Sequence, residues 1–98
     1  MNVVAKQALA RFWSLHPSAQ GPLTAWYVLA SKTSWRTPQD VKSQFGSHVD
    51  FVGDNRAIFD IGGNKYRLIV RISYVYKTVL IKFLGTHAEY DRIDPERI

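Results

Sequence analysis

The stretch KYRLIVRISY, Lys65–Tyr74, alternates between two kinds of residue and therefore predicts a β-strand with two unlike faces. One face is apolar or aromatic and consists of Tyr66, Leu68, Val70, Ile72 and Tyr74. The other face consists of Lys65, Arg67, Ile69, Arg71 and Ser73. Because the apolar face has to be covered, this strand predicts a sheet with other elements packed against one side.

Two neighbouring runs extend the strand into an antiparallel meander of about three strands. The run Arg56–Ile61 alternates weakly and is followed by Gly62-Gly63-Asn64, residue types that tolerate the positive φ of a hairpin turn. A second turn is expected near Tyr74–Lys77. The run Thr78–Leu84 is apolar and β-branched, which is typical of a central strand covered on at least one face.

Lys82 interrupts the last of these runs. A lysine in a central strand is costly to bury without a partner, so we expect its side chain to reach the open face beside Arg67 and Arg71. A snorkelling stem is the alternative. Alternation then assigns three side chains to the core face, namely Val79, Ile81 and Phe83.

The residues that precede the meander have helical spacing. Apolar side chains recur at intervals of three and four from Ala5 to His16, and Pro17 is predicted to end this helix. Ser18–Pro22 is predicted to be a turn, and a second helix is expected from near Pro22 to Ser31. Val3-Val4 fits either a short strand or the entry of the first helix.

A third, short helix is predicted from Thr37 to Gly46. Thr37 suits the N-cap, Pro38 the first helical position, and Asp40 can complete a capping box. Helices that precede the strands indicate the α+β class, with the N-terminal helices packed on one face of a small, mainly antiparallel sheet. The length of 98 residues predicts one domain, residues 1–98.

Composition excludes several classes of protein. The hydrophobic content of 46% and the aromatic content of 13% are too high for a disordered chain. No cysteine is present, and the three histidines, His16, His48 and His87, lack metal-ligand spacing, so no metal or other cofactor is expected. No apolar run approaches the ~20 residues of a membrane span. We therefore expect a cytoplasmic protein that does not contact membranes.

The positive charge is concentrated in the meander. The net charge is +5, and the residues from Arg56 to Lys82 include six basic side chains but only one acidic side chain, Asp60. The residues from Phe83 onward are net negative. A clustered positive field suits a polyanion such as nucleic acid, although basic residues can also serve solubility alone.

The polar face of Lys65–Tyr74 is a candidate phosphate-binding surface. Lys65 and Arg67 are two residues apart, and Arg67 and Arg71 are four residues apart, so their cationic groups are expected roughly 7 and 13 Å apart along the strand. The planar fork of arginine binds phosphate with two hydrogen bonds. No acid is expected on this face to neutralise it. The alternative is an ordinary solvated outer face.

The segment GTHAEYD, Gly85–Asp91, follows the last strand and carries further candidates. His87 supplies an imidazole, and histidine as a residue type suits a proton donor or acceptor near neutral pH. Tyr90 can donate a proton or stack on a nucleobase. In the alternative interpretation, His87 caps a turn and Tyr90 packs at the sheet edge. Glu89 and Asp91 are expected only to orient these groups.

Several pieces of the chain together resemble one family. They are DNR (54–56), GNKYRLIVRI (63–72) and GTHAEYD, together with FWSLHP (12–17), PLTAWY (22–27) and WRTPQDVKSQF (35–45). From Val3 to Asp94 the sequence closely resembles the HigB-type toxins of bacterial type II toxin–antitoxin pairs, within the RelE-like superfamily. The resemblance implies a small α+β toxin that cleaves mRNA, typically on the ribosome.

The resemblance also implies partners. A helix-turn-helix antitoxin is expected to inhibit the toxin, and the complex to bind operator DNA mainly through the antitoxin. RelE-like toxins resemble one another in using basic residues of the open sheet face with a Tyr or His near the C-terminus.

By that likeness, each candidate residue receives an expected role in metal-independent cleavage by a ribose 2′-hydroxyl. Arg67 and Arg71 are expected to stabilise phosphate, and Lys82 to bind phosphate or transfer a proton. His87 is the first choice for acid–base work, and Tyr90 is a proton donor or stacking residue. Arg56 and Lys65 are expected to hold RNA. The alternative function is a non-catalytic RNA-binding or ribosome-binding module.

Overall fold

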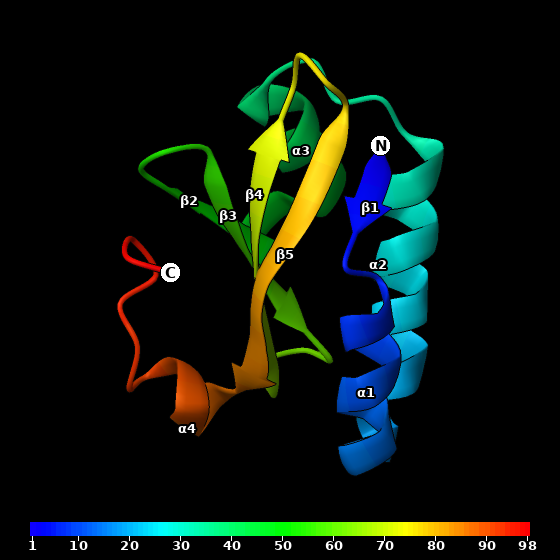
Figure 1. The fold of residues 1–98 in the computed structure, drawn as a ribbon, viewed down its shortest axis with the longest axis vertical. Helices are drawn as coiled ribbons and strands as arrows, with labels where there is room; N and C mark the ends of the chain where they lie inside the picture. The colour runs from blue at the N-terminus through cyan, green and yellow to red at the C-terminus, as the bar shows by residue number, and fades with distance from the viewer.

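The computed structural model describes residues 1–98 and contains one five-stranded sheet with the strand order β1-β5-β4-β3-β2 (Figure 1). Four strands form an antiparallel run: β2 Val49–Val52, β3 Arg56–Ile61, β4 Tyr66–Ser73 and β5 Thr78–Thr86. The remaining strand, β1 Asn2–Val4, pairs in parallel with β5. The predicted α+β class with a mainly antiparallel sheet is confirmed.

The helices α1 Gln7–Leu15 and α2 Gln20–Lys32 lie side by side along one face of this sheet (Figure 1). The main core lies between them and the sheet. It includes Leu9, Leu23, Trp26 and Ala30 from the helices and Leu68, Val70, Ile72 and Val79 from the strands. None of the helices combines the length and the apolarity that a membrane span requires.

The start of the second helix differs from the sequence prediction, and one strand was not predicted. Pro17–Ala19 forms a short 3₁₀ turn and α2 begins at Gln20, so Pro22 lies inside the first helical turn rather than in a loop. Proline is tolerated there because the first amides of a helix have no helical acceptor. Strand β2 was missed because its four residues do not alternate clearly. Of the two possibilities for Val3-Val4, the structure has the strand.

The third helix, α3 Pro38–Phe45, begins and ends as predicted. Thr37 Oγ1 accepts a hydrogen bond from the Asp40 amide, and Gly46 ends the helix with a positive φ of 58°. The capping box is incomplete, because Asp40 Oδ2 accepts from the Arg36 amide at 2.8 Å instead of from Thr37. Asp40 thus stabilises the helix entry one residue earlier than expected.

A register shift in β5 changes which side chains face the helices. Ile69 lies opposite Phe83 but Val70 lies opposite Ile81, so Lys82 is the extra residue of a β-bulge. Side chains directly opposite each other share a face, which places Phe83 with Ile69 on the face away from the helices. The prediction that Phe83 belongs to the helix-facing core is therefore wrong, and Leu84 packs there instead.

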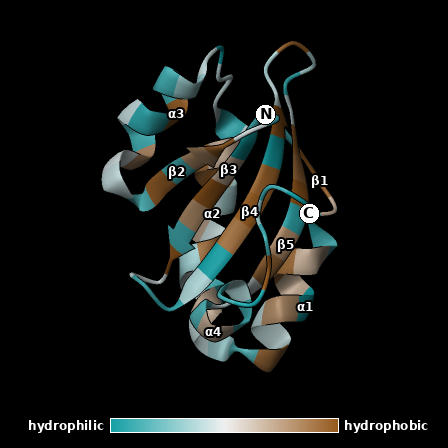
Figure 2. Ribbon diagram, turned by 90° about the vertical axis from the view of Figure 1, so that its left-hand side faces the viewer, coloured by the Kyte–Doolittle hydropathy of each residue, from teal (hydrophilic) through white to brown (hydrophobic).

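The open face of the sheet has a small apolar layer of its own. Ile58 and Ile69 lie opposite each other and are only 5% and 0% exposed, yet neither belongs to the core under the helices. Figure 2 shows the segment after the short helix α4 His87–Tyr90 crossing this face over β4. We conclude that the C-terminal segment covers the two isoleucines.

The layer on the open face leads to a stability prediction. We expect Ile69→Ala to lower the free energy of unfolding by about 2–5 kcal/mol, the usual cost of truncating a fully buried aliphatic side chain. Leu80→Ala is the matched control, because Leu80 lies on the same face but is 38% exposed. It should cost about 1 kcal/mol or less. Urea denaturation measures both, and equal small losses would show that the C-terminal segment does not cover this face.

Candidate functional site

Arg67 lies on the open face of β4, where its guanidinium group contacts residues of β3, of the β3–β4 turn and of β4 itself. Its Nε is 3.2 Å from Asp60 Oδ1 on the neighbouring strand β3. Its Nη1 donates to the main-chain oxygens of Asn64 and Tyr66, and its Nη2 donates to the Asn64 side chain. The residue is only 8% exposed. These contacts fix the direction of the guanidinium group, as a buried cation requires.

Helix α4 begins with a reciprocal capping box. Thr86 Oγ1 accepts from the Glu89 amide at 3.2 Å, and Glu89 Oε1 accepts from the Thr86 amide at 2.8 Å. These hydrogen bonds from the Thr86 main chain and side chain lower the pKa of the Glu89 carboxyl group, and His16 and Arg92 add smaller effects. The His87 amide also donates to Lys65 O at 3.1 Å, which ties α4 to the start of β4.

Gly85 allows α4 to approach the sheet closely. A Cβ atom on Gly85 would lie 2.6 Å from Cζ of Phe83 and 3.2 Å from Cβ of Glu89. The Phe83 ring therefore occupies the space that any side chain at position 85 would need. The bulge at Lys82 turns Phe83 to the open face, and Gly85, two residues after Phe83, leaves room for its ring.

Tyr90 of α4 lies against Arg67 on the open face, and a chain of contacts leads from Tyr90 to His87 and Asp91. The Arg67 Cζ lies 5.7 Å from the centre of the Tyr90 ring, within the range of a cation–π contact. The rings of Tyr90 and His87 are 6.5 Å apart and nearly perpendicular. His87 Nδ1 lies 3.1 Å from Asp91 Oδ2. We call Arg67, His87, Tyr90 and Asp91 the His87 cluster.

The contact with Asp91 decides which histidine nitrogen is free. An ionised carboxylate only accepts hydrogen bonds. His87 Nδ1 therefore carries the ring proton and donates a hydrogen bond to Asp91. In neutral His87, Nε2 is then an unprotonated base. The His87 side chain is 46% exposed, which leaves this nitrogen accessible to a substrate.

A second group of charges lies at the other end of the open face. Arg71 Nη2 is 3.1 Å from Asp54 Oδ1, and Arg56 Nη1 is 3.2 Å from Asp54 Oδ2. Arg56 also donates through Nε and Nη2 to the main-chain oxygen of Ile98. We call Arg56, Arg71 and Asp54 the Asp54 cluster. Arg71 of this cluster lies about 13 Å along β4 from Arg67, since Arg71 follows Arg67 by four residues.

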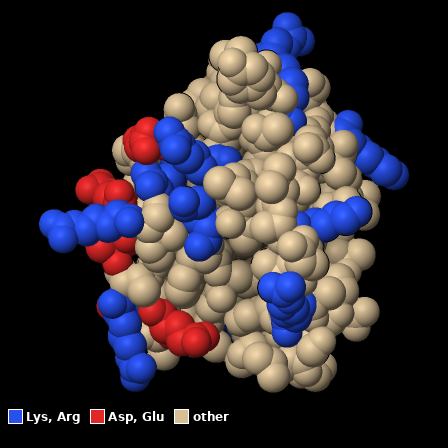
Figure 3. All heavy atoms as spheres, in the orientation of Figure 1, with Lys and Arg blue, Asp and Glu red and all other residues tan.

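The prediction that no acid neutralises the polar face of β4 is therefore wrong. Asp60 pairs with Arg67, and Asp54 pairs with both Arg56 and Arg71. Figure 3 shows acidic groups against basic ones on the side that carries the C-terminal segment. The prediction considered one strand alone, whereas the acids come from β3 and the turn before it.

The two lysines lie outside both clusters. Lys65 and Lys82 form no ion pair and no side-chain hydrogen bond. Lys82 lies at the bulge of β5 and lines a shallow hollow with Arg11 and Phe12 of α1. The structure thus brings Arg67, His87 and Tyr90 together, sets Arg71 and Arg56 apart from them, and leaves Lys82 beside α1.

Asp60 and Asn64 are the neighbours of Arg67 that the sequence prediction missed. Counting back through the hairpin would have found Asp60, because a turn over Gly62–Lys65 pairs Ile61 with Tyr66 and hence Asp60 with Arg67. The contact of Asn64 depends on the side-chain conformation of Arg67, and no sequence signal indicates it.

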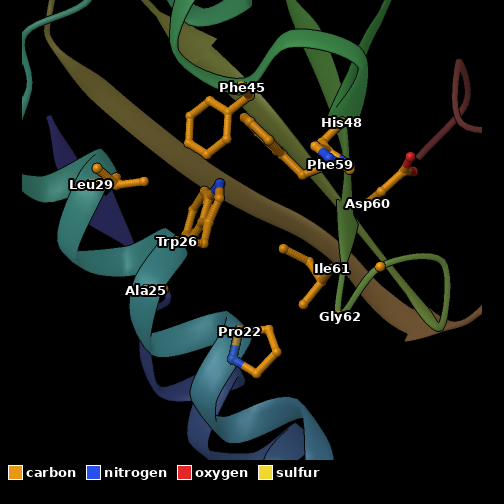
Figure 4. A pocket seen from close by; sticks show the side chains of 11 residues that line it. Pro22, Ala25, Trp26, Leu29, Phe45, His48, Phe59, Asp60, Ile61 and Gly62 are labelled. Atoms are coloured by element: carbon orange, nitrogen blue, oxygen red, sulfur yellow. The ribbon is translucent and has the colours of Figure 1, made fainter.

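A further hollow, of about 240 Å³, lies on the helix side between α2 and β3. Figure 4 shows Trp26, Phe45 and Phe59 around it, with His48 and Asp60 at its rim. No lysine or arginine lines it, so it does not suit a phosphate group. It contains none of the predicted site residues.

Comparison with known proteins identifies similar chains. Residues 19–93 match the HigB toxin family model, described as the RelE-like toxic component of a toxin–antitoxin system. An mRNA interferase HigB of Escherichia coli O6:H1 is 28% identical over 94 residues, which cover 95% of this chain and 91% of that protein. The mRNA interferase toxin HigB of Escherichia coli K12 is 26% identical over 92 residues, which cover 93% and 88%.

The capping box of α4 leads to a pH prediction. Because hydrogen bonds from Thr86 favour the carboxylate, the pKa of Glu89 lies below its ordinary value of 4.5 in the folded protein. The stabilisation of α4 is therefore present above about pH 4.5 and is lost as the pH falls through the lower, folded-state pKa. NMR titration of the Glu89 carboxyl carbon measures this pKa. Thr86→Ala should raise it, while Thr86→Ser should leave it unchanged, and an equal pKa in all three proteins would contradict the capping box.

Proposed function

Because this chain belongs to the HigB family of RelE-like toxins from toxin–antitoxin systems, we propose that it is an endoribonuclease that cleaves mRNA. The observation that supports this activity in the structure is the His87 cluster. It combines an accessible imidazole nitrogen, a phenol and a fixed cation on one exposed face. The names of the relatives, which are mRNA interferases, agree with it.

The proposed reaction is attack of a ribose 2′-hydroxyl on the adjacent phosphorus. The hydroxyl loses its proton to a base, a bond from O2′ to phosphorus forms, and the bond to the 5′-oxygen breaks. The leaving oxygen takes a proton from an acid, which gives a 2′,3′-cyclic phosphate and a free 5′-hydroxyl. The reaction therefore needs one proton acceptor, one proton donor and positive charge near the phosphate.

His87 and Tyr90 are the proposed proton-transfer residues. His87 Nε2 is suited to accept the proton of the 2′-hydroxyl, because Nδ1 is engaged with Asp91. The Tyr90 hydroxyl is the proposed proton donor to the leaving oxygen, and the Arg67 guanidinium lies 5.7 Å from the centre of the Tyr90 ring. Asp91 acts as a positioning residue, since it holds the imidazole in one orientation.

The contacts of Arg67 refine the role that its position suggests. A guanidinium group has five N–H donors, and hydrogen bonds to Asn64 and Tyr66 use three of them, while Nε lies in the ion pair with Asp60. One donor remains for a phosphate oxygen. We propose that Arg67 stabilises the transition state mainly through its fixed positive charge, which a nearly buried site screens little.

The more exposed cations are the proposed contacts for the rest of the RNA. Arg71 is half-exposed and uses only one N–H on Asp54, so most of its fork is available to phosphate. Lys65 and Lys82 have free ammonium groups that suit flanking phosphates. Arg56, 9% exposed and bound to Ile98, contributes its charge more than a direct contact.

The cellular setting is proposed on the same basis. We propose that the substrate is mRNA on the ribosome in the cytoplasm, so that cleavage stops translation and growth. The net charge of +5 suits a surface made of RNA. We further propose that a cognate helix-turn-helix antitoxin neutralises the protein, and that the complex reaches operator DNA mainly through that antitoxin.

Two substitutions test the catalytic assignment. We expect His87→Ala and Tyr90→Phe each to lower the rate of mRNA cleavage by about 10²- to 10⁴-fold, the usual contribution of a proton-transfer group. Tyr90→Phe keeps the ring on Arg67 and removes only the hydroxyl group. Cleavage in a translating extract and growth arrest on induction are the measurements.

His48→Ala is the matched control, because His48 is an exposed histidine on the helix side of the sheet. It should cleave at the rate of the parent protein. Full activity of both site variants would contradict the His87 cluster as the catalytic site. A parent protein that binds RNA but releases no fragments from translated mRNA would instead favour the non-catalytic binding module.

A further inference from the structure

A hollow of about 370 Å³ lies beside Arg71, at the end of the β4–β5 hairpin and next to the turn between β2 and β3. Its volume falls in the range of small-molecule sites. It contains no member of the His87 cluster, and Arg71 lies about 13 Å along β4 from Arg67. A group bound there would not touch the proposed proton-transfer residues.

The walls of the hollow combine the groups that recognise a nucleotide. Arg71 supplies a half-exposed guanidinium that Asp54 orients through one N–H. Ser73 and Thr78 supply hydroxyl groups, and Val75 and Leu80 supply exposed apolar surface. A charged fork for phosphate beside apolar surface for a base fits RNA better than an apolar protein segment.

Asn55 is the group in this hollow that is suited to read a base. It adopts a positive φ of 59°, and its main-chain oxygen accepts from the Ile72 amide at 2.9 Å, which holds it against β4. No hydrogen bond engages its side-chain amide. A free amide offers a donor and an acceptor side by side, the pattern that matches the edge of a nucleobase.

We propose that this hollow is a subsite for one nucleobase of single-stranded RNA, with Asn55 reading the base edge and Arg71 holding the phosphate. The subsite rests on the proposed function for its biological substrate. It gives the enzyme a sequence preference at a nucleotide further along the strand than the bond that is cut. Double-stranded RNA is excluded from it, because paired bases do not present free edges in this way.

Binding of four hexaribonucleotides, each made of a single base, tests the subsite. All proteins carry His87→Ala, so that no RNA is cut during titration, and fluorescence anisotropy gives the affinities. Asn55→Gly removes the amide, and glycine keeps the positive φ without strain. Asn55→Asp keeps the shape but replaces the amide donor with a second acceptor. Gln7→Ala, an exposed amide on α1, is the matched control.

We expect the parent protein to favour one base by about tenfold, the effect of one good base contact. Asn55→Gly should reduce the spread among the four bases to about twofold, Asn55→Asp should change the preferred base, and Gln7→Ala should leave the order unchanged. A parent protein without preference, or an Asn55→Gly protein with the parent's order and spread, would overturn the subsite. Unchanged RNA affinities with weaker capture of the antitoxin would also overturn it and assign the hollow to a protein partner.

Mapping of cleavage ends on translated mRNA, with His87 restored, separates this inference from the proposed function. If Asn55→Gly cleaves at the parent's positions with the parent's base preference, the subsite is refuted and the proposed nuclease activity stands. If binding is base-selective and depends on Asn55, but the parent protein never cleaves translated mRNA, the subsite stands and the proposed nuclease activity is refuted.

Discussion

The buried guanidinium of Arg67 joins three parts of the chain on the sheet face opposite α1 and α2. Asp60 holds it from β3, Asn64 holds it from the hairpin turn, and the Tyr90 ring lies against it from α4. A cation that is 8% exposed is stable only with such partners, so each of these segments has its position set by the same charge. The site is therefore built around an ion pair, and the residues proposed for chemistry are arranged beside it.

The bulge at Lys82 is the second constraint, and it acts through side-chain direction. The extra residue moves Phe83 to the open face and leaves Leu84 for the core. Phe83 then fills the space beside Gly85, and α4 starts directly afterwards with its capping box. A regular β5 would present a different set of side chains to α4, so the geometry of the His87 cluster depends on one irregular residue in a strand.

The acids on the open face pair with its arginines and so change both the size and the arrangement of its positive charge. Asp54 and Asp60 reduce the net field, but they also orient the arginines, and an oriented fork recognises phosphate more selectively than a mobile one. The surface divides into a nearly buried cation for the proposed chemistry and more exposed cations for holding RNA. This division explains why two arginines on one strand face can have different roles.

The sequence alone determined the elements whose pattern is local. The alternation of Lys65–Tyr74, the glycine turn before it and the Thr37 cap each depend on neighbouring residues, and the structure has β3, β4 and α3 where these signals indicate them. The family likeness also followed from short motifs. Only the tertiary structure decided the face of Phe83, the partners of Arg67 and the separation of Arg71 from His87. These depend on cross-strand register and on how the C-terminal segment folds back, which are contacts between residues distant in the chain and so leave no periodic signal in it.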